Sequence, residues 1–305
     1  MSRCLVTGGS GFIGSHVVDE LLEAGHQVLV LDYAAQPHRD DVEFFEANLT
    51  DADRILDASR NCDYIFHLGA VADLNAAVRD PALCAQVNVL GTINILEAAR
   101  RNEVKRVILA SSVWIYSGSP RSELKENDPF YSPKIGPFYS SSKIAAELFC
   151  HEYSKEFAQP FTILRYGTPF GPRMREPLAV HSFITKVLAN EPITIWGNGT
   201  QSRQFIYVQD LARAHCLVLS DKGTNKTFNI AGSQMVTITE MVNAICTLLG
   251  KQVKIVYEPA RSNEEPIINV SIAKVKEELG WEPKVTLEEG LKKTIDWYRT
   301  QVTSS

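Results

Sequence analysis

Short apolar runs alternate with amphipathic segments along the first half of the chain. The runs occupy residues 4–6, 27–31, 42–47, 63–68, 104–110 and 161–165. Between them, apolar residues recur at helical spacing, most clearly over 81–101 and 139–157. Apolar runs that alternate with helices are typical of a parallel sheet buried on both faces. Because such crossovers are right-handed, we expect a doubly wound α/β sheet.

The pattern changes after residue 167, where later apolar segments become shorter and irregularly spaced. The residues that interrupt the periodicity are Pro169, Gly171, Pro172 and Pro177. We therefore expect a first domain over 1–168 and a smaller C-terminal α/β domain over 169–305, which mainly binds substrate. Segments near 203–230 are expected to return to the first domain.

A glycine-rich turn, Thr-Gly-Gly-Ser-Gly-Phe-Ile-Gly over residues 7–14, follows the first apolar run. Gly8 permits a tight turn, Gly11 lets the backbone approach a pyrophosphate, and Gly14 lets helix and strand pack closely. Phe12 and Ile13 begin the following helix, whose unpaired N–H groups attract phosphates. This arrangement indicates a dinucleotide-binding domain of the Rossmann type.

An acidic residue, Asp32, ends the second apolar run about 20 residues after the glycines, at the spacing of a ribose-binding acid. A carboxylate at this place accepts hydrogen bonds from the adenosine ribose hydroxyls. It would also repel a 2′-phosphate, because two anions would meet. The expected cofactor is therefore NAD rather than NADP.

The composition excludes several classes of partner. The 305 residues carry a net charge of −5 and are 45% hydrophobic and 22% charged, as in soluble globular proteins. This charge gives no reason to expect nucleic-acid binding, and no polybasic run suggests a membrane surface. With no cleavable signal and no apolar run of membrane length, we expect a cytoplasmic protein. The six cysteines lack metal-ligand spacing, so we expect buried free thiols and no metal.

Tyr139 and Lys143 lie four residues apart at the start of a predicted helix, so they share one helical face. An ammonium close to a phenol favours the phenolate, and we expect Lys143 to lower the pKa of Tyr139 toward neutral pH. Ser111 and Ser112 follow a central strand, on the edge where open α/β sheets bind ligands. A serine hydroxyl there can hydrogen-bond the substrate oxygen that Tyr139 deprotonates.

Together these motifs resemble the extended short-chain dehydrogenase/reductases, in particular the NAD-dependent nucleotide-sugar epimerase/dehydratase group. The resemblance extends over nearly the whole length. The segments that carry it are the glycine turn at 7–14, His-Leu-Gly-Ala at 67–70, Asn-Val-Leu-Gly-Thr at 88–92, the serines at 111–112, the Tyr139/Lys143 pair, and the segments at 165–166, 171–173, 203–210 and 278–281.

The resemblance implies a catalytic set of Ser112, Tyr139 and Lys143. Tyr139 would take the proton of a sugar hydroxyl, and Lys143 would hold the nicotinamide ribose. The positions implied for NAD are Gly8, Gly11, Phe12, Ile13, Gly14, Asp32, Asn48, Leu49, Leu68, Gly69, Ala70, Asn88, Ser111, Tyr139, Lys143 and Tyr166. Asn48 stands where the family usually has Asp, and its amide can still bond the adenine amino group.

The resemblance also implies a site for a nucleotide-sugar diphosphate, in which arginines supply the charge. Arg203 and Arg261 match the phosphate-binding positions, and Glu264 matches an acid that binds the nucleotide ribose. The segment from Thr194 to Trp196 matches one that pairs with the base. The sugar would lie against Ser112, Tyr139 and Thr168.

The two residues after Ser112 indicate the reaction. Dehydratases of the family carry an acid and a base there, and decarboxylases carry a Glu. Val113 and Trp114 can move no proton. The resemblance therefore implies a UDP-hexose 4-epimerase, with glucose and galactose as the default pair, that oxidises carbon 4 transiently and returns the hydride.

Other activities of the same group stay open. Thr168 stands where sugar epimerases commonly have Asn, and Trp114 narrows the space beside the serine. Both fit a different sugar, or a one-way nucleotide-sugar dehydrogenase or ketoreductase. A dehydratase of the same family is a further alternative. A non-catalytic NAD-binding regulator is disfavoured, because Tyr139 and Lys143 are present. Since family members commonly dimerise through two long helices, we also expect a homodimer through 81–101 and 139–157.

Overall fold

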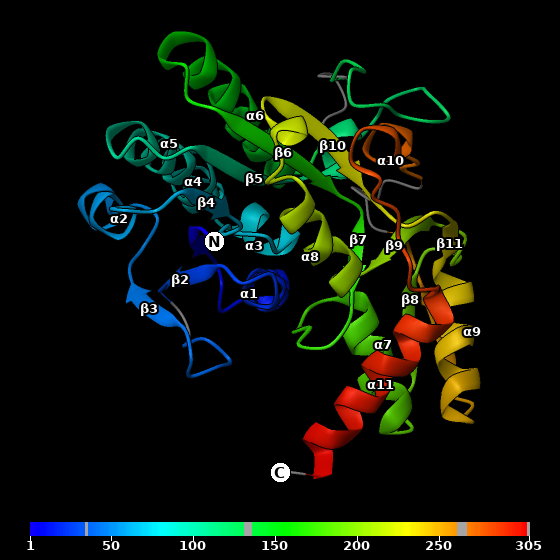
Figure 1. The fold of residues 1–305 in the computed structure, drawn as a ribbon. Coiled ribbons are helices and arrows are strands. Elements are labelled where there is room, and N and C mark those ends of the chain that lie inside the picture. Colours follow the sequence, from blue (N-terminus) through cyan, green and yellow to red (C-terminus); the bar gives the residue numbers. More distant parts are fainter. Residues whose placement is uncertain (34–35, 131–135, 261–266, 304–305) are drawn as a thin grey trace.

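The centre of the fold is a seven-stranded sheet in which each strand pairs in parallel with its neighbours. The structure is a computed structural model, and it describes residues 1–33, 36–130, 136–260 and 267–303 (Figure 1). The spatial order is β10-β6-β5-β4-β1-β2-β3. The strands are β1 (Arg3–Thr7), β2 (Gln27–Asp32), β3 (Glu43–Glu46), β4 (Tyr64–His67), β5 (Arg106–Ser112), β6 (Phe161–Tyr166) and β10 (Lys226–Ile230). The strand order runs outward in both directions from β1 and β4, which confirms the predicted doubly wound sheet.

Helices cover both faces of this sheet (Figure 1). One face carries α1 (Phe12–Glu23), α8 (Val208–Leu217) and α10 (Ala273–Leu279), and the other carries α2 (Ala52–Ala58), α5 (Gly91–Arg101) and α6 (Phe138–Phe157). Strand side chains alternate between the two cores: Cys4 and Val6 join the first, and Leu5 joins the second. The continuous apolar runs of the sequence follow from this two-sided burial.

The predicted helix over 81–101 is continuous but not uniform. It consists of α4 (Pro81–Ala85), a π-helical turn η1 (Gln86–Leu90) and α5, and it follows the short α3 (Leu74–Arg79). With a mean hydropathy of 1.3 it is long and apolar enough, by length and composition, to cross a membrane. The expectation that no segment approaches that length is therefore wrong. In the structure α5 packs against the sheet through Ile95 and Leu96.

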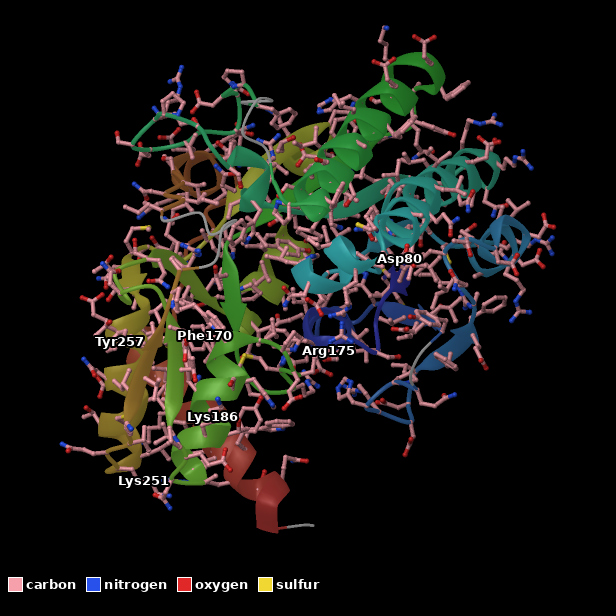
Figure 2. The ribbon with its side chains drawn as sticks, turned by 180° about the vertical axis from the view of Figure 1, so that it is seen from behind. Asp80, Phe170, Arg175, Lys186, Lys251 and Tyr257 are labelled. Carbon is pink, nitrogen blue, oxygen red and sulfur yellow. The ribbon has the colours of Figure 1, made fainter. Side chains whose placement is uncertain are left out.

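A second group of elements adjoins the carboxyl end of the sheet. It contains a three-stranded sheet, β11-β9-β7, and a two-stranded sheet, β12-β8. The strands are β7 (Thr168–Phe170), β8 (Ile193–Trp196), β9 (Ser202–Tyr207), β11 (Met235–Thr237) and β12 (Ile255–Glu258), and the helices are α7 (Ala179–Leu188), α9 (Ile238–Leu249) and α11 (Leu287–Thr303). Figure 2 shows Phe170, which is buried, within this group and Lys251 at its far end.

The chain passes between the two groups more than once. It leaves the large sheet after β6, forms β7 to β9, and then returns. Helix α8 packs on α1, and β10 pairs with β6. The chain also forms two short 3-10 turns, η2 (Val113–Tyr116) and η4 (Asp221–Gly223). The carboxyl end of β6 leads directly into β7, which pairs with β9, and this edge of the large sheet holds the candidate site.

Candidate active site

The glycine turn is built so tightly that side chains are excluded. Gly8 has a φ of 69°, and a Cβ placed on it would lie 2.7 Å from the backbone N of Gly69. A Cβ on Gly14 would lie 2.1 Å from the carbonyl oxygen of Gly8. A Cβ on Gly11 would meet only that same oxygen, at 3.1 Å. The turn therefore presses helix α1 and the loop after β4 together and leaves Gly11 open to a ligand.

The N-terminus of α1 is available to an anion. Its N-cap residue is Gly11, and no side chain caps the helix. The first N–H groups of a helix have no partner within the helix. Together with the helix dipole they make the N-terminus at Phe12 and Ile13 suited to the phosphate that the sequence predicts there.

Asp32 lies where the sequence places it, at the end of β2 next to the glycine turn. Its Oδ2 accepts from the backbone N–H of Ser10 at 3.2 Å, and its Oδ1 accepts from that of Tyr33 at 2.9 Å. The carboxylate thus lies beside the glycine turn, where an adenosine ribose would be bound.

The other residues that are predicted to bind the cofactor lie in packed or hydrogen-bonded positions. Leu49 packs against Gly69 and Gly91, and Leu68, Gly69 and Ala70 follow β4. Asn88 is 2% exposed, and its amide group bonds Val71 N–H and C=O and the hydroxyl of Ser142. Asn88 therefore fixes the loop that carries Gly69 and Ala70. Asn48 accepts from the N–H and hydroxyl of Thr50.

Ser112, Tyr139 and Lys143 come together between the end of β5 and the start of α6. The Nζ of Lys143 donates to the carbonyl of Ala110 at 2.9 Å and lies 5.8 Å from the centre of the Tyr139 ring. Ser112 lies close enough to Tyr139 to influence the pKa of its phenol. The structure therefore assembles the three residues that the sequence predicts as a catalytic set.

The predicted lowering of the pKa of Tyr139 is wrong for the polypeptide itself. Although the ring is partly exposed, desolvation raises the pKa of Tyr139 to about 12, against the effect of Ser112, which lowers it. Desolvation likewise lowers the pKa of Lys143 to about 8. Burial disfavours the charged form of both groups, and this effect outweighs the proximity from which the lowering was predicted.

Tyr166 is placed by a histidine that the sequence did not single out. Its hydroxyl lies 2.6 Å from Nε2 of His215, whose Nδ1 lies 3.1 Å from the carbonyl of Leu211. Because a carbonyl only accepts, Nδ1 carries the proton and Nε2 accepts from Tyr166. Helix α8 therefore fixes the ring at the end of β6, close enough to Tyr139 for the two to interact electrostatically.

His67 performs a similar task behind the glycine turn. Thr92 donates to the carbonyl of Asn88, so the Nε2–H of His67 donates to Thr92 at 3.1 Å. The hydroxyl of Thr7 then donates to Nδ1 at 2.8 Å and accepts from the N–H of Gly69. This chain of bonds joins the ends of β1 and β4, where the cofactor residues lie.

The predicted substrate residues lie on the adjoining sheets. Thr168 begins β7 and pairs with Phe205 of β9. Arg203 lies on β9, with its guanidinium centre 5.1 Å from the centre of the Trp114 ring. Thr194 and Trp196 lie on β8, which pairs with β12, and Trp196 is 40% exposed. Arg261 and Glu264 lie outside the described residues. Ser111, which was predicted to bind the cofactor, donates its hydroxyl to Glu147 of α6.

Comparison with known proteins decides the family. The sequence profile described as "NAD dependent epimerase/dehydratase family" matches residues 4–231. The chain belongs to this family. It is therefore an NAD-dependent enzyme, as the glycine turn and Asp32 predict.

Relatives within the family carry different activities. A putative UDP-glucose 4-epimerase of Methanocaldococcus jannaschii is 33% identical over 97% of this chain and 98% of its own length. A UDP-N-acetyl-alpha-D-glucosaminuronate decarboxylase of Bacillus cytotoxicus is 30% identical, over 97% of this chain and 98% of its own. These relatives therefore agree in family and differ in the reaction that their names give.

Solved structures of family members have the same fold. The UDP-glucose 4-epimerase of Thermotoga maritima with UDP-glucose matches with a TM-score of 0.92 and 32% identity, over 98% of this chain and 99% of that one. The UDP-glucose 4-epimerase of Thermus thermophilus in complex with NAD matches with a TM-score of 0.86 and 32% identity, over 97% of this chain and 99% of that one.

The residues of this chain fit NAD. Gly8, Gly11 and Gly14 let a phosphate approach the backbone closely and leave no room for a side chain. Asp32 lies beside these glycines. Among the described residues, no group of three or more His, Cys, Asp or Glu side chains is placed to hold a metal ion. The supporting residues His67, His215 and Glu147 were missed. For Glu147, its four-residue spacing from Lys143 on the same helical face was an available signal.

Proposed function

We propose that this enzyme interconverts UDP-hexoses that differ at carbon 4, with UDP-glucose and UDP-galactose as the default pair. The observation that carries the proposal is the turn after Ser112. Val113 is buried in an apolar cluster, and Trp114 lies beneath Arg203. Neither position offers the additional acid or base that elimination or decarboxylation would use. Oxidation and re-reduction of one carbon needs only the three residues that the structure assembles.

Each of these residues has one task in that reaction. Tyr139 takes the proton of the carbon-4 hydroxyl and returns it to the product. Ser112 holds the same oxygen by a hydrogen bond. Lys143, with a pKa lowered to about 8 by desolvation, carries a positive charge at neutral pH and favours the phenolate that forms on Tyr139. NAD supplies the acceptor and later donor of the hydride at carbon 4.

Arg203 supports recognition of the nucleotide part. It is a cation on β9 in a protein of net charge −5, and a diphosphate needs such a local charge. In the proposal Arg261 joins it, Glu264 binds the ribose, and the segment from Thr194 to Trp196 lies along the base. Thr168, at the start of β7, contacts the sugar in this proposal.

We also propose that the enzyme is a homodimer. The two long helices expose apolar side chains, among them Leu83 and Leu90 at 45% each and Leu148 at 53%. Large exposed apolar residues gathered on neighbouring helices are typical of an interface. Helices α4, η1 and α5 contact α6, so the two can form one continuous surface for a second copy.

The experiment is a turnover assay across a panel of UDP-sugars. The NAD-loaded enzyme is incubated with UDP-glucose, UDP-galactose, their N-acetyl analogues and UDP-glucuronate, and products are identified by NMR. The proposal requires 4-epimers in both directions with no net change in NADH absorbance. A stoichiometric change in NADH would favour the dehydrogenase or ketoreductase instead, and a 4-keto-6-deoxy product would favour the dehydratase.

The Tyr139→Phe variant is the control for mechanism. It retains the ring and loses the proton carrier, so turnover should disappear while NAD stays bound. Unchanged activity in this variant would refute the role of Tyr139.

A further inference from the structure

Trp114 lies between the catalytic serine and the arginine proposed for the diphosphate. Its backbone N–H donates to the hydroxyl oxygen of Ser112 at 3.2 Å. Its indole lies beneath the guanidinium of Arg203, with 5.1 Å between the ring centre and Cζ. One residue thus contacts both ends of the proposed substrate site, across the boundary between the large sheet and the three-stranded sheet.

The turn that carries Trp114 is anchored by apolar packing. The other residues of its turn, Val113, Ile115 and Tyr116, are buried in one apolar cluster, against which Trp114 packs while partly exposed. Tyr116 also donates its hydroxyl to Asn229. This packing therefore holds the backbone at Trp114 in place, while part of its indole remains outside the core.

The backbone of Arg203 is equally well held. It lies on β9, the middle strand of the three-stranded sheet, and the side chain of its neighbour Gln204 bonds the carbonyl of Gly232 and both backbone groups of Val270. The long Arg203 side chain still has many rotamers, and holding it in one costs conformational entropy. The contact with Trp114 and the bond from its Nη1 to the carbonyl of Ser202 at 2.8 Å restrict those rotamers.

An aromatic face suits this purpose better than a carboxylate would. It attracts the cation through the ring quadrupole, without neutralising the charge and without requiring an N–H donor. A guanidinium that lies on a ring can form charge-assisted hydrogen bonds with a phosphate through its N–H groups.

We propose that Trp114 is a positioning residue that orients Arg203 toward the diphosphate of the substrate. It thereby sets the spacing between the diphosphate and the sugar carbon at Ser112. This inference rests on the proposed nucleotide-sugar substrate, and it adds a role for a residue that otherwise only narrows the site.

The test is a double-mutant cycle on UDP affinity, measured by calorimetry with the NAD-loaded enzyme. Trp114→Leu should weaken UDP binding by about three- to tenfold, the range that a partly desolvated cation–π contact supports. Trp114→Phe keeps an aromatic face and should lose less than about twofold. In an Arg203→Met background, Trp114→Leu should cause no further loss, because its partner is gone.

A matched control is available elsewhere in the chain. Arg100 lies over the ring of Phe157, also at 5.1 Å, at the far end of α6. Phe157→Leu removes an equivalent stack and should leave UDP affinity unchanged. If Trp114→Leu fails to fold, Trp114→Gln, which suits a partly exposed position, replaces it in the same cycle.

The inference is overturned if Trp114→Leu weakens UDP equally with and without Arg203, if the Phe variant loses as much as the Leu variant, or if the wild-type enzyme binds no UDP. Because binding is measured without turnover, the two proposals fail separately. A coupled cycle in an enzyme that interconverts no UDP-hexose would retain this role and refute the epimerase. Additive losses in an active epimerase would do the reverse.

Discussion

Glu147 and Arg165 form a buried ion pair directly behind the catalytic residues. Oε2 of Glu147 lies 2.6 Å from Nη2 of Arg165, and the side chains are 1% and 5% exposed. Ser111 donates to the same carboxylate, and Arg165 also donates to Tyr116 at 2.6 Å. Burial lowers the pKa of Arg165, but the charge and hydrogen bonds of Glu147 together with those of Tyr116 outweigh it, so the net pKa lies above its usual value. The pair joins α6, which carries Lys143, to the strands β5 and β6.

We predict that Glu147→Gln strongly destabilises the enzyme. Removing one partner leaves the other as an uncompensated buried charge, which costs about 3–5 kcal/mol. Equilibrium unfolding in urea measures the loss. Glu97 is the matched control, because it too forms ion pairs with arginine, in its case Arg100 and Arg101, but at the surface. Glu97→Gln should cost less than about 1 kcal/mol, and equal losses in the two variants would contradict the importance of burial.

A second prediction concerns the cofactor. Replacing Asp32 by Ala should weaken NAD binding and reduce the preference for NAD over NADP, each by about tenfold, because two hydrogen bonds and one like-charge repulsion are removed. Calorimetry of NAD-free protein with both nucleotides provides the comparison. Glu46 lies beside Asp32 in the register of β3 with β2, so Glu46→Gln tests the effect of net charge alone. A similar change in both variants would show that Asp32 has no specific contact with the ribose.

Strands β1 to β6 of the large sheet could be predicted because each contains a short apolar run. The run over 161–165 predicts β6 (Phe161–Tyr166) almost to the residue. Pairing is different: β10 adds to β6 after more than fifty intervening residues, and no local signal in either strand names the other. The short β7 and β8 were also hard to delimit, because three- or four-residue strands carry little periodicity.

The proximity of Tyr139 and Lys143 was predictable because it follows from their four-residue spacing on one helix. The direction of the pKa of Tyr139 was not, since spacing reports proximity and says nothing of desolvation. Arg165 is a charged residue inside a buried strand, and no partner for it was predicted from the sequence. Identifying that partner as Glu147 required the packing of α6 on the sheet.

A third prediction follows from two buried histidines, His67 and His215, which are 1% and 0% exposed. Burial lowers the pKa of His67 to about 3 and that of His215 to about 4, from 6.5 in the unfolded chain. Between about pH 4 and 6.5 the unfolded state therefore binds protons that the native state does not. The free energy of unfolding should fall as the pH falls, by about 1.4 kcal/mol per pH unit for each histidine.

Denaturant titrations at several pH values across this window measure that slope. His215→Gln should reduce it by the contribution of one histidine, whatever its effect on absolute stability. His26, which is partly exposed and only modestly shifted by burial, provides the control, and His26→Gln should change the slope less. An unchanged slope in the His215 variant would show that this residue is already charged in the native state.

The last prediction concerns the apolar surface of the two long helices. The segment over 81–101 reaches a mean hydropathy of 1.3, yet only 44% of its most apolar window is buried. The sheet covers Ile95 and Leu96, whereas Leu83 and Leu90 remain exposed, as does Leu148 of the neighbouring helix α6. A chain that stayed monomeric in water would gain nothing from this second apolar face, because its exposure favours association.

Leu148→Glu, which places a charge in the proposed interface, should convert the dimer to a monomer in light scattering at micromolar concentration. Leu178, which is 36% exposed and lies just before α7, is the matched control, and Leu178→Glu should remain dimeric. A monomeric wild-type protein, or a Leu148→Glu variant that stays dimeric, would place the interface elsewhere or refute it.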